Sequence, residues 1–280
     1  MKLTEKIHLL QIDFEIALSP EKKLPRFVNV ILVLGDKITL IDSGVKGSET
    51  KIRDYIQQNN RDFSEIDTLI LSHSHPDHIG SAAKIKELTG CKILAHESEK
   101  EWIENIEIQN ILRPVPGFFN LVDRSVKIDE PILDGQELII DEGVTLKFIH
   151  TPGHSKGSLN IEFKEDKILF TADSIPLKND IPNYDNYIDL MKSLDGIRKN
   201  AGHRILLTSW TAPMTDKMEI DRLLNEGEEY MKKIDSAVRD CYEKEKPSTL
   251  DLCRTVVEKL GLPIFLVNPI VDKAFRSHLN

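Results

Sequence analysis

The stretch LSHSHPDHIGSA, residues 71–82, places three histidines and one aspartate within six consecutive positions. The chain of 280 residues contains only nine histidines, so this segment holds a third of them. The apolar run DTLILS before it is typical of a short buried strand, and GSAAKIKELTG after it is typical of a helix. We therefore predict that His73, His75, Asp77 and His78 lie on a loop at the carboxyl end of a strand, where α/β proteins commonly build their sites.

The spacing of these side chains indicates two neighbouring metal positions. In extended backbone, His73 and His75 are two residues apart, so both side chains point to the same side and can reach one cation. Asp77 and His78 follow the rigid Pro76 and can turn toward a second position. Imidazole and carboxylate together suit zinc, iron or manganese. The alternative is a polar loop in which Asp77 caps the following helix, which accounts for the aspartate but not for three histidines.

Two later strands also end in candidate ligands. The alternating segment VTLKFIH, residues 144–150, runs into the turn TPGH, which carries His154. The segment ILFTADS, residues 168–174, ends a strand at Asp173. Because sites in such folds are assembled from the ends of several strands, we expect both side chains to join the histidine cluster.

Composition restricts the class of protein. Hydrophobic residues make up 40% of the chain and charged residues 30%, which is typical of a globular fold. The formal net charge of −9 disfavours nucleic-acid binding, and no apolar run approaches the ~20 residues that span a bilayer. The N-terminus MKLTEKIHLL is too charged for a signal peptide, and the three cysteines form no CxxC pair. We therefore expect a cytoplasmic protein that has neither a membrane nor nucleic acid as a partner.

The order of the predicted elements divides the chain into two parts. Residues 1–95 alternate strand-like and helix-like segments, and residues 127–172 form a run of predicted strands. After a helix near 185–200 and the strand RILLTS, only helical patterns follow. We predict one domain over residues 1–215 and a C-terminal helical extension over residues 216–280. The apolar stripe of MEIDRLLNEGEEYMKKI must be buried, either over the edge of the site or in a subunit contact such as a homodimer.

These motifs together resemble those of the metallo-β-lactamase superfamily. Its HxHxDH signature corresponds to His73, His75, Asp77 and His78. The resemblance implies that His154, from TPGH, is a further ligand, and that Asp173, from FTAD, bridges two metals. It also implies that Asp42, in LIDSG, contacts a ligand rather than a metal. The fold expected from it is a four-layer αβ/βα sandwich of two mixed β-sheets, with the metals at one edge and the C-terminal helical extension beyond.

One position departs from the pattern of that superfamily. The strand after the penultimate helix normally ends in Gly-His, and that histidine completes the second metal position. Here the segment reads ILLTSWTAP, and Trp210 stands in its place. Tryptophan offers only an N–H donor and cannot bind a metal, so we expect one or two zinc ions with a weak second position, or else iron or manganese. Water, a hydroxyl of Ser209 or Thr211, or an outside histidine such as His278 would complete that position.

The resemblance implies a metal-dependent hydrolase of the glyoxalase II or lactonase type. A water activated by the metal would attack an ester, thioester or lactone of a small molecule, with Asp77 as the catalytic residue that orients it. Two other functions stay open: a mononuclear-iron oxidoreductase resembling the persulfide dioxygenases, and a degenerate member that binds a metal or ligand without turnover. The nucleic-acid-processing branch is disfavoured by the acidic charge and by the absence of an inserted β-CASP-like domain.

Aromatic residues in the irregular stretches near the motifs are candidates for the wall of a substrate pocket. These residues are Phe118, Phe119, Tyr184, Tyr187 and Trp210. Together they would make an apolar mouth with few fixed charges. The alternative is that some of the phenylalanines fold into the hydrophobic core.

Overall fold

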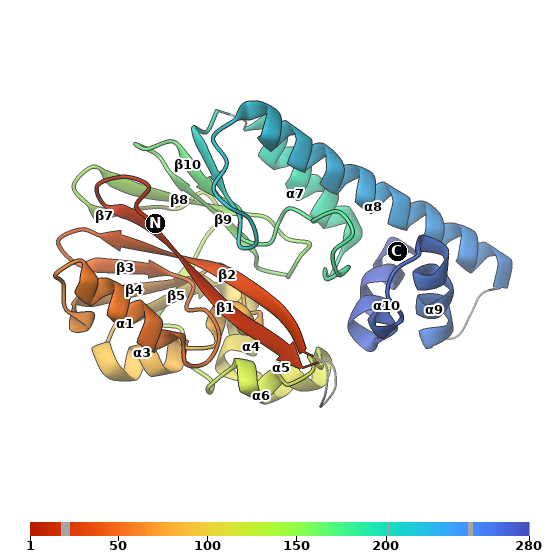
Figure 1. Cartoon of the computed structure of the whole chain (residues 1–280), viewed down its shortest axis with the longest axis horizontal. Helices are drawn as coiled ribbons and strands as arrows, with labels where there is room; N and C mark the ends of the chain where they lie inside the picture. The colour runs from red at the N-terminus through yellow and green to blue at the C-terminus, as the bar shows by residue number, and fades with distance from the viewer. Residues whose placement is uncertain (18–22, 201, 246–248, 280) are drawn as a thin grey trace.

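The computed structural model describes residues 1–17, 23–200, 202–245 and 249–279, and shows two β-sheets face to face with helices on both outer sides (Figure 1). One sheet contains, in spatial order, β1 (Ile7–Ala17), β2 (Lys23–Leu34), β3 (Ile38–Ile41), β4 (Ile66–Leu71), β5 (Lys92–His96) and β6 (Glu130–Ile132). The other contains β11 (Ile205–Leu207), β10 (Ile168–Phe170), β9 (Leu159–Phe163), β8 (Val144–His150) and β7 (Glu137–Asp141). Both sheets combine parallel and antiparallel neighbours, so the predicted sandwich of two mixed sheets is confirmed.

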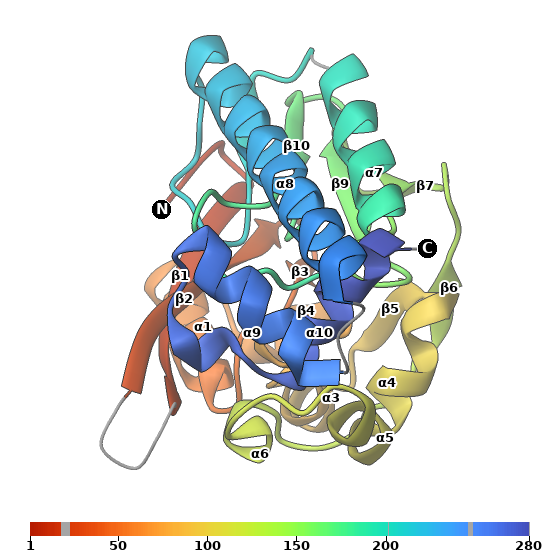
Figure 2. The ribbon, with the colours of Figure 1, turned by 90° about the vertical axis from the view of Figure 1, so that its right-hand side faces the viewer.

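Helices cover the outer faces of both sheets and build the C-terminal part of the chain. They are α1 (Ser48–Gln58), α2 (Pro76–Ile79), α3 (Ala82–Thr89), α4 (Lys100–Glu104), α5 (Ile106–Leu112), α6 (Phe118–Leu121), α7 (Tyr187–Lys199), α8 (Lys217–Glu245), α9 (Thr249–Leu260) and α10 (Pro269–Arg276). Short 3₁₀ turns are η1 (Phe63–Glu65), η2 (Glu97–Glu99), η3 (Ile264–Leu266) and η4 (Ser277–Leu279). The helices α1 and α3 lie outside the six-stranded sheet, whereas α7 and α8 lie side by side outside the five-stranded sheet (Figures 1 and 2).

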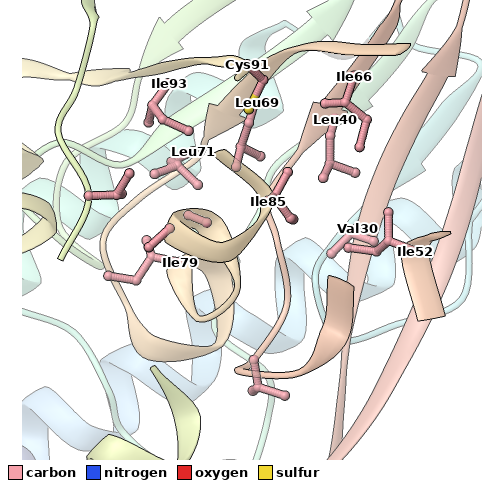
Figure 3. Packing of buried hydrophobic residues seen from close by; sticks show 14 of the residues in the cluster. Val30, Leu40, Ile52, Ile66, Leu69, Leu71, Ile79, Ile85, Cys91 and Ile93 are labelled. Atoms are coloured by element: carbon pink, nitrogen blue, oxygen red, sulfur yellow. The ribbon is translucent and has the colours of Figure 1, made fainter. Parts of the chain in front are cut away.

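Alternating side chains of the strands fill two separate apolar layers. In β4, Leu69 and Leu71 point toward the outer helices and Ile70 points toward the opposite sheet, because successive strand residues face opposite sides. Figure 3 shows Leu69 and Leu71 in one cluster with Ile85 of α3 and Ile52 of α1. The strand is therefore packed on both faces, and the segment that follows its carboxyl end starts from a rigid support.

The segment after β4 differs in part from the prediction. Residues 76–79 form the short helix α2, which begins at Pro76 and is preceded by His75 at the N-cap. Proline suits this first position, since its φ is fixed and the missing N–H would have no helical partner there. Asp77 and His78 therefore lie within a helical turn rather than on an open loop, and the alternative that Asp77 caps the next helix is wrong.

The C-terminal helices pack on the rest of the chain. The long helix α8 runs beside α7 and contacts α9 and α10 (Figure 2). Met231 and Ile234 of α8 are fully buried in an apolar cluster that also contains Tyr184, Leu190 and Phe275. The predicted apolar stripe is thus buried within the chain itself. Among the described residues, no helix combines the length and the apolar character that a membrane crossing requires.

Candidate metal centre

The structure brings all six predicted ligands to one edge of the sandwich, on segments that follow three strands. After β4 come His73, His75, Asp77 and His78, after β8 comes His154, and after β10 comes Asp173. All of these side chains are buried except that of Asp77, which is partly exposed. They divide into two groups that share one carboxylate.

The first group has four members whose potential ligand atoms all lie within 4.8 Å of one another: His73, His75, His154 and Asp173. His154 Nε2 lies 2.7 Å from His75 Nδ1 and 3.3 Å from Asp173 Oδ2. His73 Nε2 lies 3.9 Å from the same carboxylate oxygen. Three imidazoles and one carboxylate oxygen thus surround one point.

The second group consists of Asp77, His78 and the shared Asp173. His78 Nε2 lies 3.4 Å from Asp77 Oδ2 and 3.4 Å from Asp173 Oδ1. Asp173 therefore presents Oδ2 to the first group and Oδ1 to the second. This is the arrangement that a carboxylate bridging two cations requires.

Several buried polar atoms of these groups make no hydrogen bond within the described part of the chain. They include His73 Nε2, His78 Nε2, Asp77 Oδ2 and Asp173 Oδ1. Buried polar groups are almost always hydrogen-bonded, because an unpaired one costs about 1–3 kcal/mol. One cation in each group would satisfy these atoms. The combined nitrogen and oxygen donors fit a divalent metal such as zinc, iron or manganese.

Asp42, which was predicted to contact a ligand, accepts a hydrogen bond from His78 Nδ1 at 2.8 Å. Its buried carboxylate also accepts from the backbone N–H of Ser72 at 2.7 Å and from the Ser72 hydroxyl at 2.8 Å. A carboxylate on one ring nitrogen fixes both the tautomer and the orientation of an imidazole. Asp42 thereby directs His78 Nε2 toward the second group.

Burial and charge act differently on the imidazoles of the two groups. Burial lowers the pKa of His73 and His75 well below the usual value, so both are neutral at neutral pH and offer lone pairs to a cation. Burial also acts to lower the pKa of His78, but three surrounding carboxylates, led by Asp173, outweigh it and hold that pKa well above the usual value. A cation at the second position must therefore displace a proton from His78.

Glu99 connects two of the ligand segments, although no feature of the sequence marks it as part of the site. Its buried carboxylate accepts hydrogen bonds from the backbone N–H of Ser74 at 3.0 Å and from the Ser155 hydroxyl at 2.7 Å. It also accepts from the Ser74 hydroxyl and from the backbone N–H of Gly157. Ser74 lies between the first two histidine ligands and Ser155 follows the third. Glu99 therefore holds both segments in place.

A cavity of about 900 Å³, including its open mouth, adjoins the cluster. Asp77, His154 and Asp173 border it, so both groups open toward the same space. Most of its other walls are apolar and include Phe14, Ile16, Val115, Leu121, Ile175 and Ile181. Apolar walls next to a polar cluster restrict bulk water and strengthen the electrostatic interactions inside.

Of the five predicted wall residues, Trp210 and Tyr184 border this cavity and the other three do not. Phe118 lies in the core on the outer side of the six-stranded sheet, and Phe119 is 51% exposed. Neighbouring residues of a helix point about 100° apart, so α6 buries only one of its two phenylalanines. Tyr187 stacks on the imidazole of His278, with 4.0 Å between the ring centroids.

Trp210 borders the cavity without joining either metal group. Its indole lies 6.4 Å from the ring centroid of Phe14 and 5.5 Å from the guanidinium carbon of Arg26. His278, the predicted outside histidine, has both ring nitrogens hydrogen-bonded elsewhere. Within the described residues, no fourth His, Cys, Asp or Glu joins the second group. The hydroxyl of Ser209 is buried and has no hydrogen-bond partner among the described residues.

Comparisons with known proteins agree on one family. The sequence model of the family described as "Metallo-beta-lactamase superfamily" matches residues 24–211. A Caenorhabditis elegans protein named Beta-lactamase-like protein 2 homolog is 25% identical over 237 residues, which cover 81% of this chain and 69% of that protein. A hydroxyacylglutathione hydrolase of Bartonella henselae is 28% identical over 110 residues, which cover 39% of this chain and only 34% of that enzyme.

Solved structures share the fold over nearly the whole chain. A metallo-beta-lactamase family protein from Thermus thermophilus superimposes with a TM-score of 0.74 at 18% identity, covering 99% of this chain and 94% of that one. A beta-lactamase domain protein from Burkholderia ambifaria gives a TM-score of 0.72 at 14% identity, covering 100% of this chain and 87% of that one. Since the coverage includes α8 to α10, the C-terminal helices are part of the shared architecture.

Proposed function

Because the chain belongs to the metallo-β-lactamase superfamily, we propose that it is a metal-dependent hydrolase that cleaves an ester, thioester or lactone of a small molecule. The observation that carries the proposal is a set of buried nitrogen and oxygen atoms that have no hydrogen-bond partner among the described residues and lie next to an apolar cavity. Such a hydrolase needs both parts: a centre that activates water, and a space that admits a carbonyl compound.

The residues of the site divide into those that hold a metal and those that place the reactants. The three histidines of the first group and Asp173 would hold one cation, and Asp77 and His78 would hold another with the help of Asp173. A bound divalent cation lowers the pKa of water toward neutrality and polarises a carbonyl oxygen. Asp77 has the most exposed side chain of the cluster and borders the cavity, so its carboxylate can accept a hydrogen bond from the attacking water and orient it.

The small second group favours one further candidate, a mononuclear-iron oxidoreductase. Only three protein residues form that group within the described part of the chain. A reaction of the persulfide dioxygenase type would need only the metal of the first group. Metal analysis of the purified protein separates the functions: two zinc ions per chain favour hydrolysis, one iron ion favours the oxidoreductase, and no metal favours a degenerate member.

The test of the proposal is hydrolysis by protein of known metal content. The purified chain would be assayed on a thioester, an aryl ester and a lactone before and after treatment with a chelator. We expect turnover of at least one of the three, lost with the metal and restored by zinc. Hydrolysis that survives complete metal removal would contradict the proposal.

Substitution of Asp77 tests the role of the residue that orients the water. Asp77→Asn should lower kcat by about 100-fold or more, since an amide is a poor acceptor for the proton of the water. The first group keeps its four ligands and should keep its metal. His203→Gln is the control, because His203 lies just before β11 and contacts Glu162 at 3.3 Å, outside the cluster. Unchanged turnover in Asp77→Asn would exclude this role.

A further inference from the structure

Arg113 is a buried cation that borders the cavity next to the metal cluster. It directly follows α5, and only 5% of its surface is exposed to solvent. Nη2 donates a hydrogen bond to Asn183 Oδ1 at 2.5 Å. A guanidinium has five N–H donors, and no carboxylate of the described residues forms an ion pair with this one. Most of its hydrogen-bonding capacity is therefore open to a ligand.

The other arginine of the cavity, Arg26, shows how the protein satisfies such a charge. Arg26 donates to both carboxylate oxygens of Asp180, at 3.2 Å from Nη1 and 2.5 Å from Nη2. Its guanidinium also lies over the indole of Trp210. Arg26 thus has its counter-ion within the chain. Among the described residues, no carboxylate forms an ion pair with Arg113, and a buried charge without an ion-pair partner is costly.

Two carboxylates of the metal centre contribute to the charge around Arg113, together with Asp185, which forms an ion pair with Lys273 at 2.6 Å. Burial lowers the pKa of Arg113, whereas Asp185, Asp77 and Asp173 oppose that effect. Asp77 and Asp173 are the carboxylates that would hold cations, and a bound cation offsets their negative charge. With metal present, the negative charge that Asp77 and Asp173 place near Arg113 would be offset, and this would favour an anion beside the guanidinium.

We propose that Arg113 binds a carboxylate of the substrate, so that the substrate is an ester, thioester or lactone that also carries a carboxylate. The inference rests on the proposed hydrolase function and narrows its substrate class. A planar guanidinium matches a carboxylate with two parallel hydrogen bonds. Asn183, whose Oδ1 accepts from Arg113, can add a donor from its amide nitrogen. One guanidinium and one amide suit a monoanion better than a phosphate, which generally binds several cationic or backbone donors.

This contact would also position the substrate. Arg113 and Asp77 border the same cavity, whose walls also include apolar residues such as Val115 and Leu121. A carboxylate held at Arg113 would anchor one end of the molecule, and the apolar walls would contact its middle. The scissile carbonyl could then lie next to Asp77, where the attacking water is oriented.

Two esters of equal length test the inference on the metal-loaded full chain. The 4-nitrophenyl monoester of adipic acid differs from 4-nitrophenyl hexanoate by a terminal carboxylate in place of a methyl group. We expect kcat/KM to be about 10- to 100-fold higher for the anionic ester, mainly through KM, as charge-assisted hydrogen bonds allow. Arg113→Met should remove that preference and change kcat/KM for the neutral ester by less than about threefold. Arg113→Lys keeps the positive charge but loses the planar pair of N–H donors, so it should retain part of the preference for the anionic ester.

The matched control is the double variant Arg26→Met/Asp180→Asn, which removes the paired guanidinium together with its counter-ion and so leaves the net charge of the same cavity unchanged. It should change kcat/KM for both esters by the same factor and so leave the ratio of the two values unchanged. A readout without turnover is the binding of adipate, followed by the fluorescence of Trp210, which borders the cavity. Arg113→Met should weaken adipate binding by about tenfold or more. If Arg113→Met does not fold, Arg113→Lys replaces it, and we expect a smaller loss of adipate binding in that variant.

The outcomes separate the two proposals. If neither ester is hydrolysed but adipate binds the natural protein and not Arg113→Met, the hydrolase function fails and the carboxylate site stands. If both esters are hydrolysed equally and Arg113→Met binds adipate as tightly as the natural protein, the carboxylate site is overturned and the hydrolase function stands. Tighter binding of inorganic phosphate than of adipate would also overturn the assignment of a carboxylate.

Discussion

The metal cluster and His278 use buried imidazoles in opposite ways. In the cluster, His73 and His78 each have Nδ1 bonded to the protein, whereas Nε2 finds no hydrogen-bond partner within the described residues. His278 has both nitrogens occupied: Nε2 lies 2.7 Å from the hydroxyl of Tyr184 and Nδ1 lies 3.1 Å from Asp235. All three histidines are buried. Burial by itself thus does not identify a metal ligand; the cluster differs from His278 in the buried nitrogens of His73 and His78 that have no partner within the described residues.

The largest effect should follow from removal of a ligand of the first group. His154→Ala leaves two of its three imidazoles, so the metal of that group should be lost and hydrolysis should fall by about 1,000-fold or more. Metal per chain after gel filtration and kcat/KM measure the two effects. His278→Ala, the same change at the histidine with both nitrogens occupied, should keep the metal. Equal metal loss in both variants would remove the distinction between the two regions.

The free energy of unfolding should depend on pH in a way that shows the contribution of His278. Burial lowers its pKa to about 4, below the ~6.5 of an unfolded chain. Because the folded-state pKa is the lower one, the contribution is fully present above pH 6.5 and is lost as the pH falls from 6.5 toward 4. Between pH 7.5 and pH 5, the natural protein should lose about 2 kcal/mol more unfolding free energy than His278→Gln. Urea unfolding at the two pH values measures this difference, and identical losses would contradict it.

A smaller effect should follow from changes to the carboxylates behind the histidines. Asp42→Asn removes the charged acceptor on His78 and should weaken metal binding at the second position by about 10- to 100-fold, with little change at the first. Asp235→Asn makes the equivalent change behind His278 and should leave metal binding as it is. Zinc titration of the metal-free proteins tests both. Weaker metal binding in Asp235→Asn would show that the two regions are coupled.

The smallest effect should come from Trp210. Trp210→His offers an imidazole to the second group, which has three members among the described residues, and should raise occupancy of that position several-fold at limiting zinc. Trp210→Phe removes the indole without adding a ligand and is the matched control. Native mass spectrometry gives the number of metals per chain. Full occupancy of both positions in the natural protein would mean that another group already completes the second.

Local patterns were sufficient for the alternation of strands and helices and for the identity of the histidine cluster, and the family resemblance carried by these motifs implied the sandwich. The strand β4 alternates its side chains between two apolar layers, and the spacing of His73 and His75 lies within one short segment. Periodicity and ligand chemistry are properties of neighbouring residues, so a sequence displays them directly. The short helix that contains Asp77 was missed, because a single turn begun by proline carries too few residues to show a helical period.

The sequence by itself thus determined the fold class and which side chains could serve as metal ligands. Only the tertiary structure decided what surrounds them: Glu99 joins two ligand segments, and Arg113 borders the cavity without an ion pair to any described carboxylate. Met231 of α8 lines the same cavity. Phe118 was expected there and lies in the core instead. The physical reason is that these placements depend on which distant segments pack together, and the packing is set by burial across the whole molecule rather than by the pattern of any one segment.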